Sequence, residues 1–372
     1  MSTSVEVCQA VVVIAVAIEI SGSKWLVGSY AGLKSRRKSL DSRTPATRLE
    51  SLLSELATVR EKLACGKPAR MVVAYEAGHE GFWLQRALMK RSFDAQVIDP
   101  VSLKVDRRSK RAKTDRLDVE ALSRALYAWT QGDETALRMV RVPSLAAEDD
   151  REWQRERDRL RKERRAGIDR IGKKLRTQSI WSWDRESLRT GSLRDMEGQP
   201  LGPILQQALQ TELERVEWLE QQLEALESQV AKLSPNASAC IEQLMAFRGI
   251  GEVGARGLAL KLYWREFSNR REVGGCTGLV GMPYDSGRMR QDQGISKQGD
   301  PTLRALLVEL AWLWLRYQPG STITKWFRSR TEGQNKRHKR TMIVAVARRL
   351  AISWWRYLRD GVVPEGAIVA AH

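Results

Sequence analysis

The sequence is poor in the residues that build thiolate–metal sites and disulfide scaffolds. It has 4 cysteines and 3 histidines among 372 residues. No two cysteines form a Cys-x-x-Cys pair, and the four are scattered along the chain at Cys8, Cys65, Cys240 and Cys276. This spacing argues against a zinc site and against a disulfide framework, and it fits a reducing, cytoplasmic location.

Long hydrophobic runs are also missing. The longest apolar run covers residues 11–20, whereas a membrane-spanning helix needs about 20 consecutive apolar residues. No basic leader precedes this run, so we expect neither a signal peptide nor a membrane partner.

Basic residues, by contrast, are in large excess. The chain has 63 Lys and Arg against 45 Asp and Glu, a formal net charge of +18 at pH 7. Such a surplus indicates a polyanionic partner, and nucleic acid before a membrane surface. With 372 residues, 42% of them hydrophobic, the chain can form two domains and a connecting element.

The first third of the chain alternates between β-branched apolar runs and helical periodicity. Strands are expected at 11–20, 23–30, 32–40, 70–75 and 95–98, and helices at 46–64, 80–91 and 115–129. The order is therefore three strands, a helix, a strand, a helix, a strand and a helix.

Four acidic residues stand where these elements begin or end. Glu19 is near the end of the first strand, and Glu76 follows the fourth. Asp115 and Asp118, three residues apart in a helix that Thr114 can cap, project from one face. Two such acids can simply complement the helix dipole. Together with the strand-end acids they predict a site for a hard divalent cation, Mg²⁺ or Mn²⁺. This order of elements and acids resembles the RuvC/ribonuclease H-like α/β fold.

A basic segment directly precedes the acidic helix. Its cations, with Arg116 just beyond them, are Lys104, Arg107, Arg108, Lys110, Arg111 and Lys113. These residues are candidate phosphate ligands beside the acids, although a merely solvated loop is the alternative.

The middle of the chain changes in composition. A long exposed helix is expected at 148–178 and a loop at 179–203. Apolar residues then repeat every seven, at Leu209, Val216, Leu223 and Val230, with Leu219, Leu226 and Leu233 offset by three. This a/d pattern predicts a helical hairpin that ends at Pro235, used for self-association or for gripping nucleic acid.

A glycine-rich motif opens the last part of the chain. Gly249, Gly251 and Gly254 formally match a dinucleotide-binding fingerprint, but no strand is expected before them. Helical spacing on both sides instead predicts a helix-hairpin-helix-like element. Its turn amides can face a phosphate, or the motif can be a tight helix corner without a ligand.

Ser286 is the candidate nucleophile of this part. It precedes Gly287 in a segment predicted to be a flexible loop, and a helix is expected from Pro301 to Tyr317. Serine before glycine is also ordinary turn chemistry. Four cations flank it and could hold a phosphate beside the hydroxyl, namely Arg288, Arg290, Lys297 and Arg304. No histidine lies nearby in sequence, which argues against a protease-type site.

A second basic group lies near the C-terminus. Lys336, Arg337, Lys339 and Arg340 precede a predicted helix that carries Trp354, Trp355 and Tyr357. Cations interleaved with aromatic residues suit a nucleic-acid surface, although much of the tryptophan can be core.

Taken together, these motifs resemble the transposases of insertion-sequence family 110, the bridge-RNA-guided recombinases. The family's first acidic motif is similar to Ile18-Glu19-Ile20-Ser21, with Lys24 displaced. Its second, Glu-Ala-x-Gly, is similar to Glu76-Ala77-Gly78, and Lys-Thr-Asp-x-x-Asp is matched by 113–118. Ser286-Gly287 stands where the family has its nucleophilic serine, and 296–299 matches a later Ser-Lys-x-Gly motif.

This resemblance implies a detailed function. An RuvC-like domain would hold Mg²⁺ through Glu19, Glu76, Asp115 and Asp118, and Ser286 would form a covalent phosphoserine with DNA. A guide (bridge) RNA would pair with target and donor DNA, and a dimer or tetramer would share its active sites between subunits. Two departures stand out: Glu19 replaces an aspartate, and the middle hairpin looks longer than in the family.

The expected architecture has three parts. An α/β RuvC-like domain spans 1–140, a helical coiled-coil hairpin 141–236, and a mainly α transposase domain 237–372. Two other functions stay open. One is a resolvase-like nuclease that uses the acids and water, with Ser286 a turn residue. The other is a non-catalytic nucleic-acid-binding protein with a decayed metal site.

Overall fold

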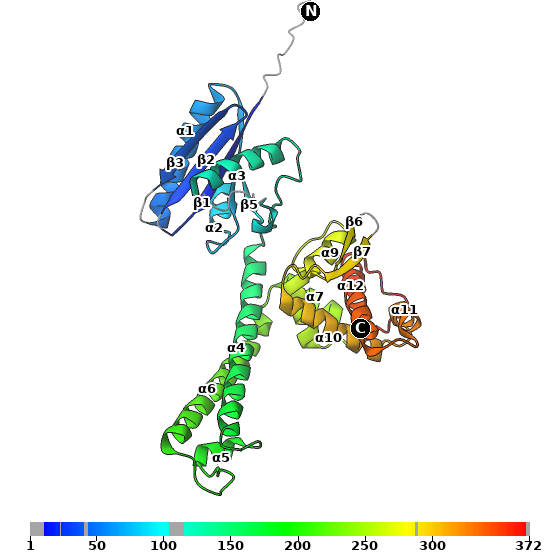
Figure 1. The fold of residues 1–372 in the computed structure, drawn as a ribbon. Coiled ribbons are helices and arrows are strands. Elements are labelled where there is room, and N and C mark those ends of the chain that lie inside the picture. The colour runs from blue at the N-terminus through cyan, green and yellow to red at the C-terminus, as the bar shows by residue number, and fades with distance from the viewer. Residues whose placement is uncertain (1–10, 23, 41–43, 104–114, 287–288, 370–372) are drawn as a thin grey trace, which may run out of the picture. The chain divides into compact units, whose positions relative to one another are not determined.

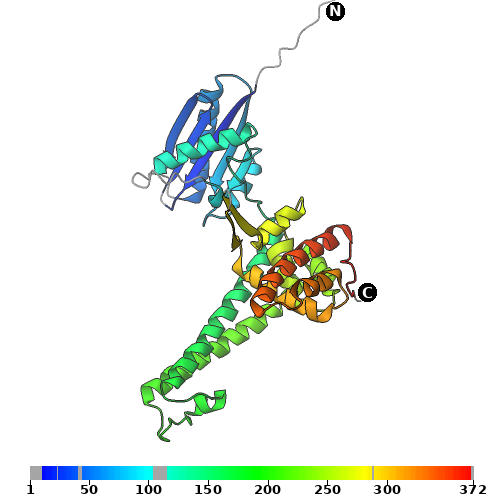
Figure 2. The same ribbon diagram turned by 45° about the vertical axis from the view of Figure 1, so that its right-hand side comes forward.

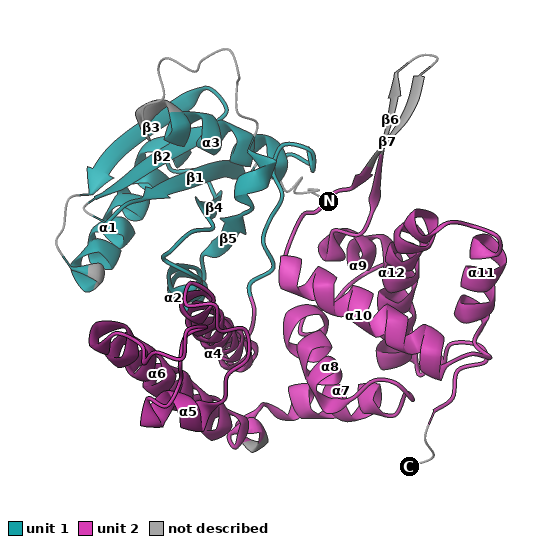
Figure 3. Cartoon of the chain, turned by 60° about the horizontal axis from the view of Figure 1, so that its bottom comes forward, with its two compact units in different colours: residues 1–142 teal, residues 143–372 magenta. Residues whose placement is uncertain are grey.

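The computed structural model describes residues 11–22, 24–40, 44–103, 115–286 and 289–369. It divides into two compact units, Met1–Val142 and Pro143–His372 (Figure 3). Among the described residues, none of the helices combines the length and hydrophobicity needed to cross a bilayer.

The first unit is built on a mixed five-stranded sheet. Its strands are β1 (Val12–Ile20), β2 (Trp25–Ala31), β3 (Lys34–Leu40), β4 (Ala69–Glu76) and β5 (Asp94–Ile98). In space they follow the order β3-β2-β1-β4-β5. The first three pair antiparallel, and β4 runs parallel to both β1 and β5. The predicted order of strands and helices in this part of the chain is confirmed.

Helices cover both faces of this sheet. They are α1 (Pro45–Ala64), α2 (Trp83–Met89) and α3 (Asp115–Thr130), with a 3₁₀ turn at Pro100–Ser102. Alternate residues of β1 point to opposite faces. Ile14, Val16 and Ile18 pack with α1, whereas Ala15 and Ala17 pack with α3. Figures 1 and 2 show α3 lying across its face of the sheet.

The second unit begins with a helical hairpin. Its elements are α4 (Leu145–Arg176), α5 (Arg185–Thr190), α6 (Pro203–Glu227) and a 3₁₀ turn at Val230–Lys232. The two long helices pack against each other, which confirms the predicted hairpin. The expected loop at 179–203 is partly wrong, because Asp184 caps the short helix α5 within it.

The heptad face of α6 is buried inside this hairpin. Leu209 and Val216 are 0% and 1% exposed, and Leu209, Val216 and Ile171 of α4 belong to one apolar cluster. The buried half of this seam therefore packs within the chain, against α4. The use of the hairpin, for self-association or for gripping nucleic acid, stays a prediction. Leu226 and Val230 pack on the core of the helical body that follows. Pro235 starts the next helix instead of only ending this one.

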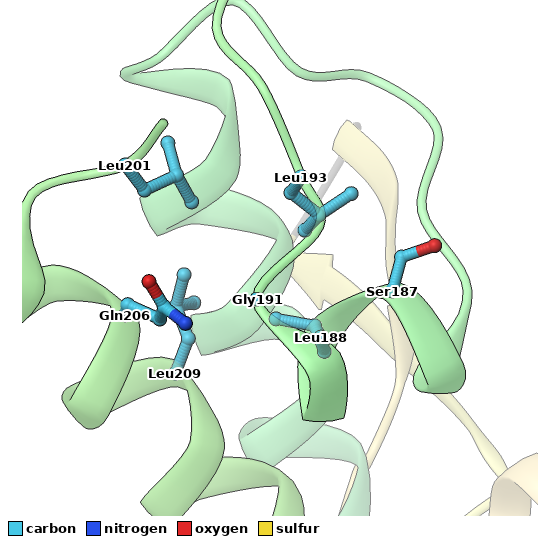
Figure 4. Close-up of a pocket in the computed structure, with 7 residues that line it drawn as sticks. All are labelled: Ser187, Leu188, Gly191, Leu193, Leu201, Gln206 and Leu209. Atoms are coloured by element: carbon cyan, nitrogen blue, oxygen red, sulfur yellow. The ribbon is translucent and has the colours of Figure 1, made fainter. Parts of the chain in front are cut away.

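A small apolar pocket lies at the tip of the hairpin (Figure 4). The residues that line it are Ser187, Leu188, Gly191, Leu193, Leu201, Gln206 and Leu209. None of these seven is charged, so the pocket is part of the packing of the tip and does not suit a phosphate.

The helical body completes the second unit. Its elements are α7 (Pro235–Met245), α8 (Glu252–Leu258) with a π-helical turn at Ala259–Tyr263, α9 (Arg270–Thr277), β6 (Gly281–Ser286), β7 (Met289–Ile295), α10 (Pro301–Tyr317), α11 (Thr322–Thr331) and α12 (Lys336–Asp360). Phe247, Trp314 and Trp354 lie in its core, 0–1% exposed. These tryptophans are therefore structural. The expected start of α10 is confirmed, since the Asp300 side chain accepts a hydrogen bond from the Thr302 backbone N–H.

Candidate metal and nucleic-acid sites

Glu19 and Glu76 stand at the same edge of the sheet. Ile18 of β1 pairs with Tyr75 of the parallel strand β4, so the two glutamates are the next residues on neighbouring strands. Neighbouring strands lie about 4.8 Å apart. Side chains alternate between the two faces of a strand, so Glu19 and Glu76 point to the same face as Ala17 and Ala74, whose side chains pack with α3. The fold therefore brings these two predicted acids to one face, half-buried Glu19 beside exposed Glu76.

Helix α3 carries the other two acids across that face. Val119, which is fully buried, packs on the same core as Ala17 and Ala74. Asp118 precedes it in the first turns of the helix and is exposed. Asp115 begins α3, but its side chain lies outside the described part of the structure.

Gly28 sets how closely α3 approaches the sheet. It pairs with Ala17, and a Cβ atom at this position would lie 2.9 Å from the Val119 carbonyl oxygen. A methyl group there would push the helix outward together with Asp118. Gly28 belongs to none of the sequence motifs, although a glycine inside a strand often marks such an approach.

If these acids hold the cation that the family resemblance implies, Gly28→Ala should impair metal-dependent strand cleavage while nucleic-acid binding is kept. A displacement of catalytic groups by about 1 Å can lower a rate about 100-fold. Cleavage rates measured at a temperature where both proteins are folded check this. The matched control is Gly22→Ala, since no atom lies within 4 Å of the added Cβ. Equal rates for the two variants would show that the approach of α3 is not critical.

The acids suit a hard cation in kind. Their donors are carboxylate oxygens, the ligands that Mg²⁺ and Mn²⁺ prefer. Among the described residues, however, no three His, Cys, Asp or Glu lie close enough to bind one ion. Glu19, Glu76 and Asp118 therefore share a face without forming a complete ligand set, and the fourth predicted ligand is Asp115.

Ser286 is the last residue of β6. It pairs with Met289 of β7, and the two residues between them, Gly287 and Arg288, lie outside the described part of the chain. The segment predicted as a flexible loop is thus a β-hairpin. The structure describes the backbone of Ser286 and Arg290, and not their side chains.

The two other cations predicted to flank Ser286 lie at the base of this hairpin. The Arg304 guanidinium donates to the carbonyl oxygens of Gln298 and Gly299, at 2.6 and 3.2 Å. Lys297 is exposed, and its backbone N–H donates to the Gly278 carbonyl oxygen. Arg304 therefore braces the hairpin, while the ammonium of Lys297 remains on the surface.

The remaining predicted cations fall into two groups. Lys104, Arg107, Arg108, Lys110, Arg111 and Lys113 lie outside the described residues. Lys336, Arg337, Lys339 and Arg340 are exposed in the first two turns of α12, which begins at Lys336 and not after this group as expected. Cations at a helix N-terminus oppose the helix dipole, so helix stability does not explain them.

The glycine-rich turn between α7 and α8 is covered by the chain's own C-terminal segment. The Arg248 N–H donates to the Ile368 carbonyl oxygen at 3.2 Å. The Gln318 side chain binds the carbonyl oxygens of both residues. Gly249, at φ 97°, lies against Tyr317. These contacts favour a tight helix corner, and the motif follows a helix and no strand, which excludes a Rossmann site here.

Comparison with known proteins agrees with the motifs. Residues 241–332 match the model of the transposase IS116/IS110/IS902 family. The protein y4rJ of Sinorhizobium fredii, which carries a transposase name, is 36% identical over 95% of this chain and 94% of its own length. The chain belongs to the IS116/IS110/IS902 transposase family.

Two further relatives have transposase names. The transposase for insertion sequence element IS1328 of Yersinia enterocolitica is 32% identical over 45% of this chain and 50% of its own. A protein of Pseudomonas aeruginosa, named as a family 20 transposase, is 26% identical over 64% of this chain and 69% of its own. The family model covers Ser286 but none of the four acids, whereas the similarity to y4rJ extends over nearly the whole chain.

Proposed function

We propose that this protein is a DNA transposase that cuts and rejoins strands through a phosphoserine, assisted by a divalent cation in an RuvC-like site. The observation that carries the proposal is the arrangement of the acids. Glu19 and Glu76 lie at the same ends of neighbouring parallel strands, Glu19 one residue before the last, and share the face that α3 covers. The transposase names of the relatives support the substrate class.

The acids would hold the cation, and Ser286 would react with DNA. Glu19, Glu76, Asp115 and Asp118 are the proposed Mg²⁺ ligands. The bound cation would supply charge neutralisation at phosphorus and would help to activate a weak nucleophile. The acids lie in the first unit and Ser286 in the second, and the proposal has the acids of one subunit act together with Ser286 of another.

The reaction balances without an external energy source. The Ser286 Oγ forms a bond to phosphorus and gives up its proton, while one bridging P–O bond of the DNA breaks. The departing sugar oxygen takes up a proton. The phosphoserine ester retains the energy of the phosphodiester, so a sugar hydroxyl of another strand can attack it and release the serine. Cutting and rejoining are then one reaction run in two directions.

A bridge RNA and assembly as a dimer or tetramer belong to the same proposal. The net charge of +18 and the exposed cations at the start of α12 support a large nucleic-acid partner. An RNA that pairs with donor and target would choose the sites, and the protein would supply the chemistry.

RNA that copurifies with the protein tests this function. We expect sequencing of that RNA to reveal one predominant species with segments complementary to the donor and target DNA. Adding it to RNA-free protein should restore recombination in the presence of Mg²⁺. Recombination at an equal rate without any RNA would contradict RNA guidance but leave the phosphoserine chemistry standing.

A further inference from the structure

Two guanidinium groups stack on one tryptophan in the second unit. Trp264 follows the π-helical turn after α8, and the central guanidinium carbon atoms of Arg151 and Arg265 each lie 4.3 Å from its ring centroid. Arg151 comes from α4, and Arg265 is the residue after the tryptophan. All three side chains are half-buried. The ring thus holds two cations that are far apart in sequence and lie within twice that distance of each other.

Neither cation has an ion-pair partner among the described residues. Two other stacks differ: Arg256 over Trp153 also binds Glu252 at 2.9 Å, and Arg359 over Trp355 also binds Asp360 at 2.6 Å. The charges of Glu148 and Asp300 act on Arg151 and favour its charged state. The nearby ammonium of Lys261 is already bound to Asp158 and Thr302. The Arg265 guanidinium also donates to the Lys261 carbonyl oxygen at 2.8 Å, so it has a neutral acceptor but no carboxylate at ion-pair distance.

This arrangement disfavours the charged state of both groups. Burial, and then the charges of Arg155 and Arg265, lower the pKa of Arg151 to about 10. Burial also lowers the pKa of Arg265. Like charges held together in a partly desolvated place repel unless an anion joins them. Repulsion between the two guanidinium groups does not stabilise the fold. An anionic ligand is the simplest explanation for the placement of both groups on one ring.

The chemistry of the groups identifies the anion. A guanidinium offers planar, paired N–H donors that match the oxygens of a phosphate group. Contact with Trp264 restricts both groups before a ligand arrives, which reduces the entropy lost on binding. Asp300, which acts electrostatically on both arginines, caps the N-terminus of α10 near the base of the β6–β7 hairpin. Ser286 lies at the other end of this hairpin, and an extended strand from Gly278 to Ser286 spans at most about 26 Å.

We propose that Arg151 and Arg265, held by Trp264, bind a backbone phosphodiester of a nucleic-acid strand. The phosphate would lie at a distance from the reacting one along the strand, because Ser286 is at the far end of the hairpin. Trp264 positions the guanidinium groups and does not stack on a base. This site is independent of the proposed chemistry, since it would bind the strand whether or not Ser286 is the nucleophile.

The test measures the dissociation constant of the full-length protein as a function of salt, in EDTA so that no cleavage occurs. The probes are oligo(dT), oligo(rU) and a DNA duplex of the same length. Losing one phosphate contact lowers the slope of log K against log salt by about 0.7 for a single strand and about 0.9 for duplex DNA. We expect this decrease, with affinity lower by about tenfold, in Arg151→Gln and in Arg265→Gln. The probe that shows the larger effect identifies the kind of strand.

Arg359→Gln is the matched control, since it removes a stacked arginine that Asp360 already neutralises. It should leave the slope unchanged. Thermal unfolding separates binding from a structural role: Arg151→Gln should melt at or above the wild-type temperature, because it relieves repulsion. An unchanged slope for all three probes in both variants, or the same decrease in Arg359→Gln, would overturn the proposal. If Arg265→Gln fails to fold, Arg151→Gln decides alone.

Discussion

Ser286→Ala is expected to bind nucleic acid normally and to form no covalent adduct and no recombinants. The substitution removes the only atom that the proposed mechanism bonds to phosphorus. A nuclease that uses water would instead keep cutting in this variant and leave free ends. Incubation with labelled target DNA, followed by denaturation and mass spectrometry of the modified peptide, measures the difference directly. Ser286→Cys can keep a trace of activity, since a thiolate is a good nucleophile.

Ser296→Ala provides the matched control for this experiment. Ser296 follows β7, and its backbone N–H donates to the Val280 carbonyl oxygen at the base of the same hairpin. The Ser296→Ala variant should form the covalent adduct at the wild-type rate. A nucleotide attached to Ser296, or adduct that persists in Ser286→Ala, would show that the nucleophile is misassigned. Free ends in both variants would favour the metal-only nuclease.

Asp118→Asn should abolish strand cleavage with little effect on binding. The amide keeps the shape of the side chain but removes the charge that a cation requires. Loss of several kcal/mol of charge stabilisation corresponds to a rate at least about 100-fold lower. Binding should stay within a few-fold, since Lys and Arg supply most of the affinity. Cleavage of labelled DNA with Mg²⁺ and with Mn²⁺ measures the cleavage rate, and a filter-binding assay measures the affinity for DNA.

The control for Asp118 lies two residues away on the same helix. Glu120 pairs with Arg37 of β3 in a half-exposed ion pair, and such pairs contribute at most about 1 kcal/mol. Glu120→Gln should therefore cut at nearly the wild-type rate. Wild-type cleavage by Asp118→Asn, or equal losses in both variants, would remove Asp118 from the proposed ligands.

Glu19 is the predicted ligand that differs from the family motif. Because its side chain is one methylene longer than aspartate, the strand end can lie slightly farther from the cation. We expect Glu19→Gln to be inactive, and Glu19→Asp to be weaker or to prefer Mn²⁺ in the same cleavage assay. Full activity of Glu19→Gln would exclude this residue as a ligand.

The sequence by itself determined the elements of the first unit and the family. Strands and helices there follow from local periodicity, since a buried β-branched run such as 11–20 and a helix face such as that of 46–64 carry their own pattern. The Asp300-Pro301 helix start is equally local. The motifs around Glu76, 113–118 and Ser286 were enough to indicate the transposase family, to which the chain belongs.

Only the tertiary structure decided which of these elements meet. A heptad repeat predicts a partner helix but not whether that helix comes from the same chain. In the structure the partner is α4, which covers Leu209 and Val216. The hairpin at Ser286 depends on pairing between two short polar strands, which local propensity does not specify. The approach of α3 at Gly28 and the meeting of Arg151 with Arg265 on Trp264 join residues distant in sequence. Such contacts depend on long-range packing, and single-sequence periodicity carries no information about it.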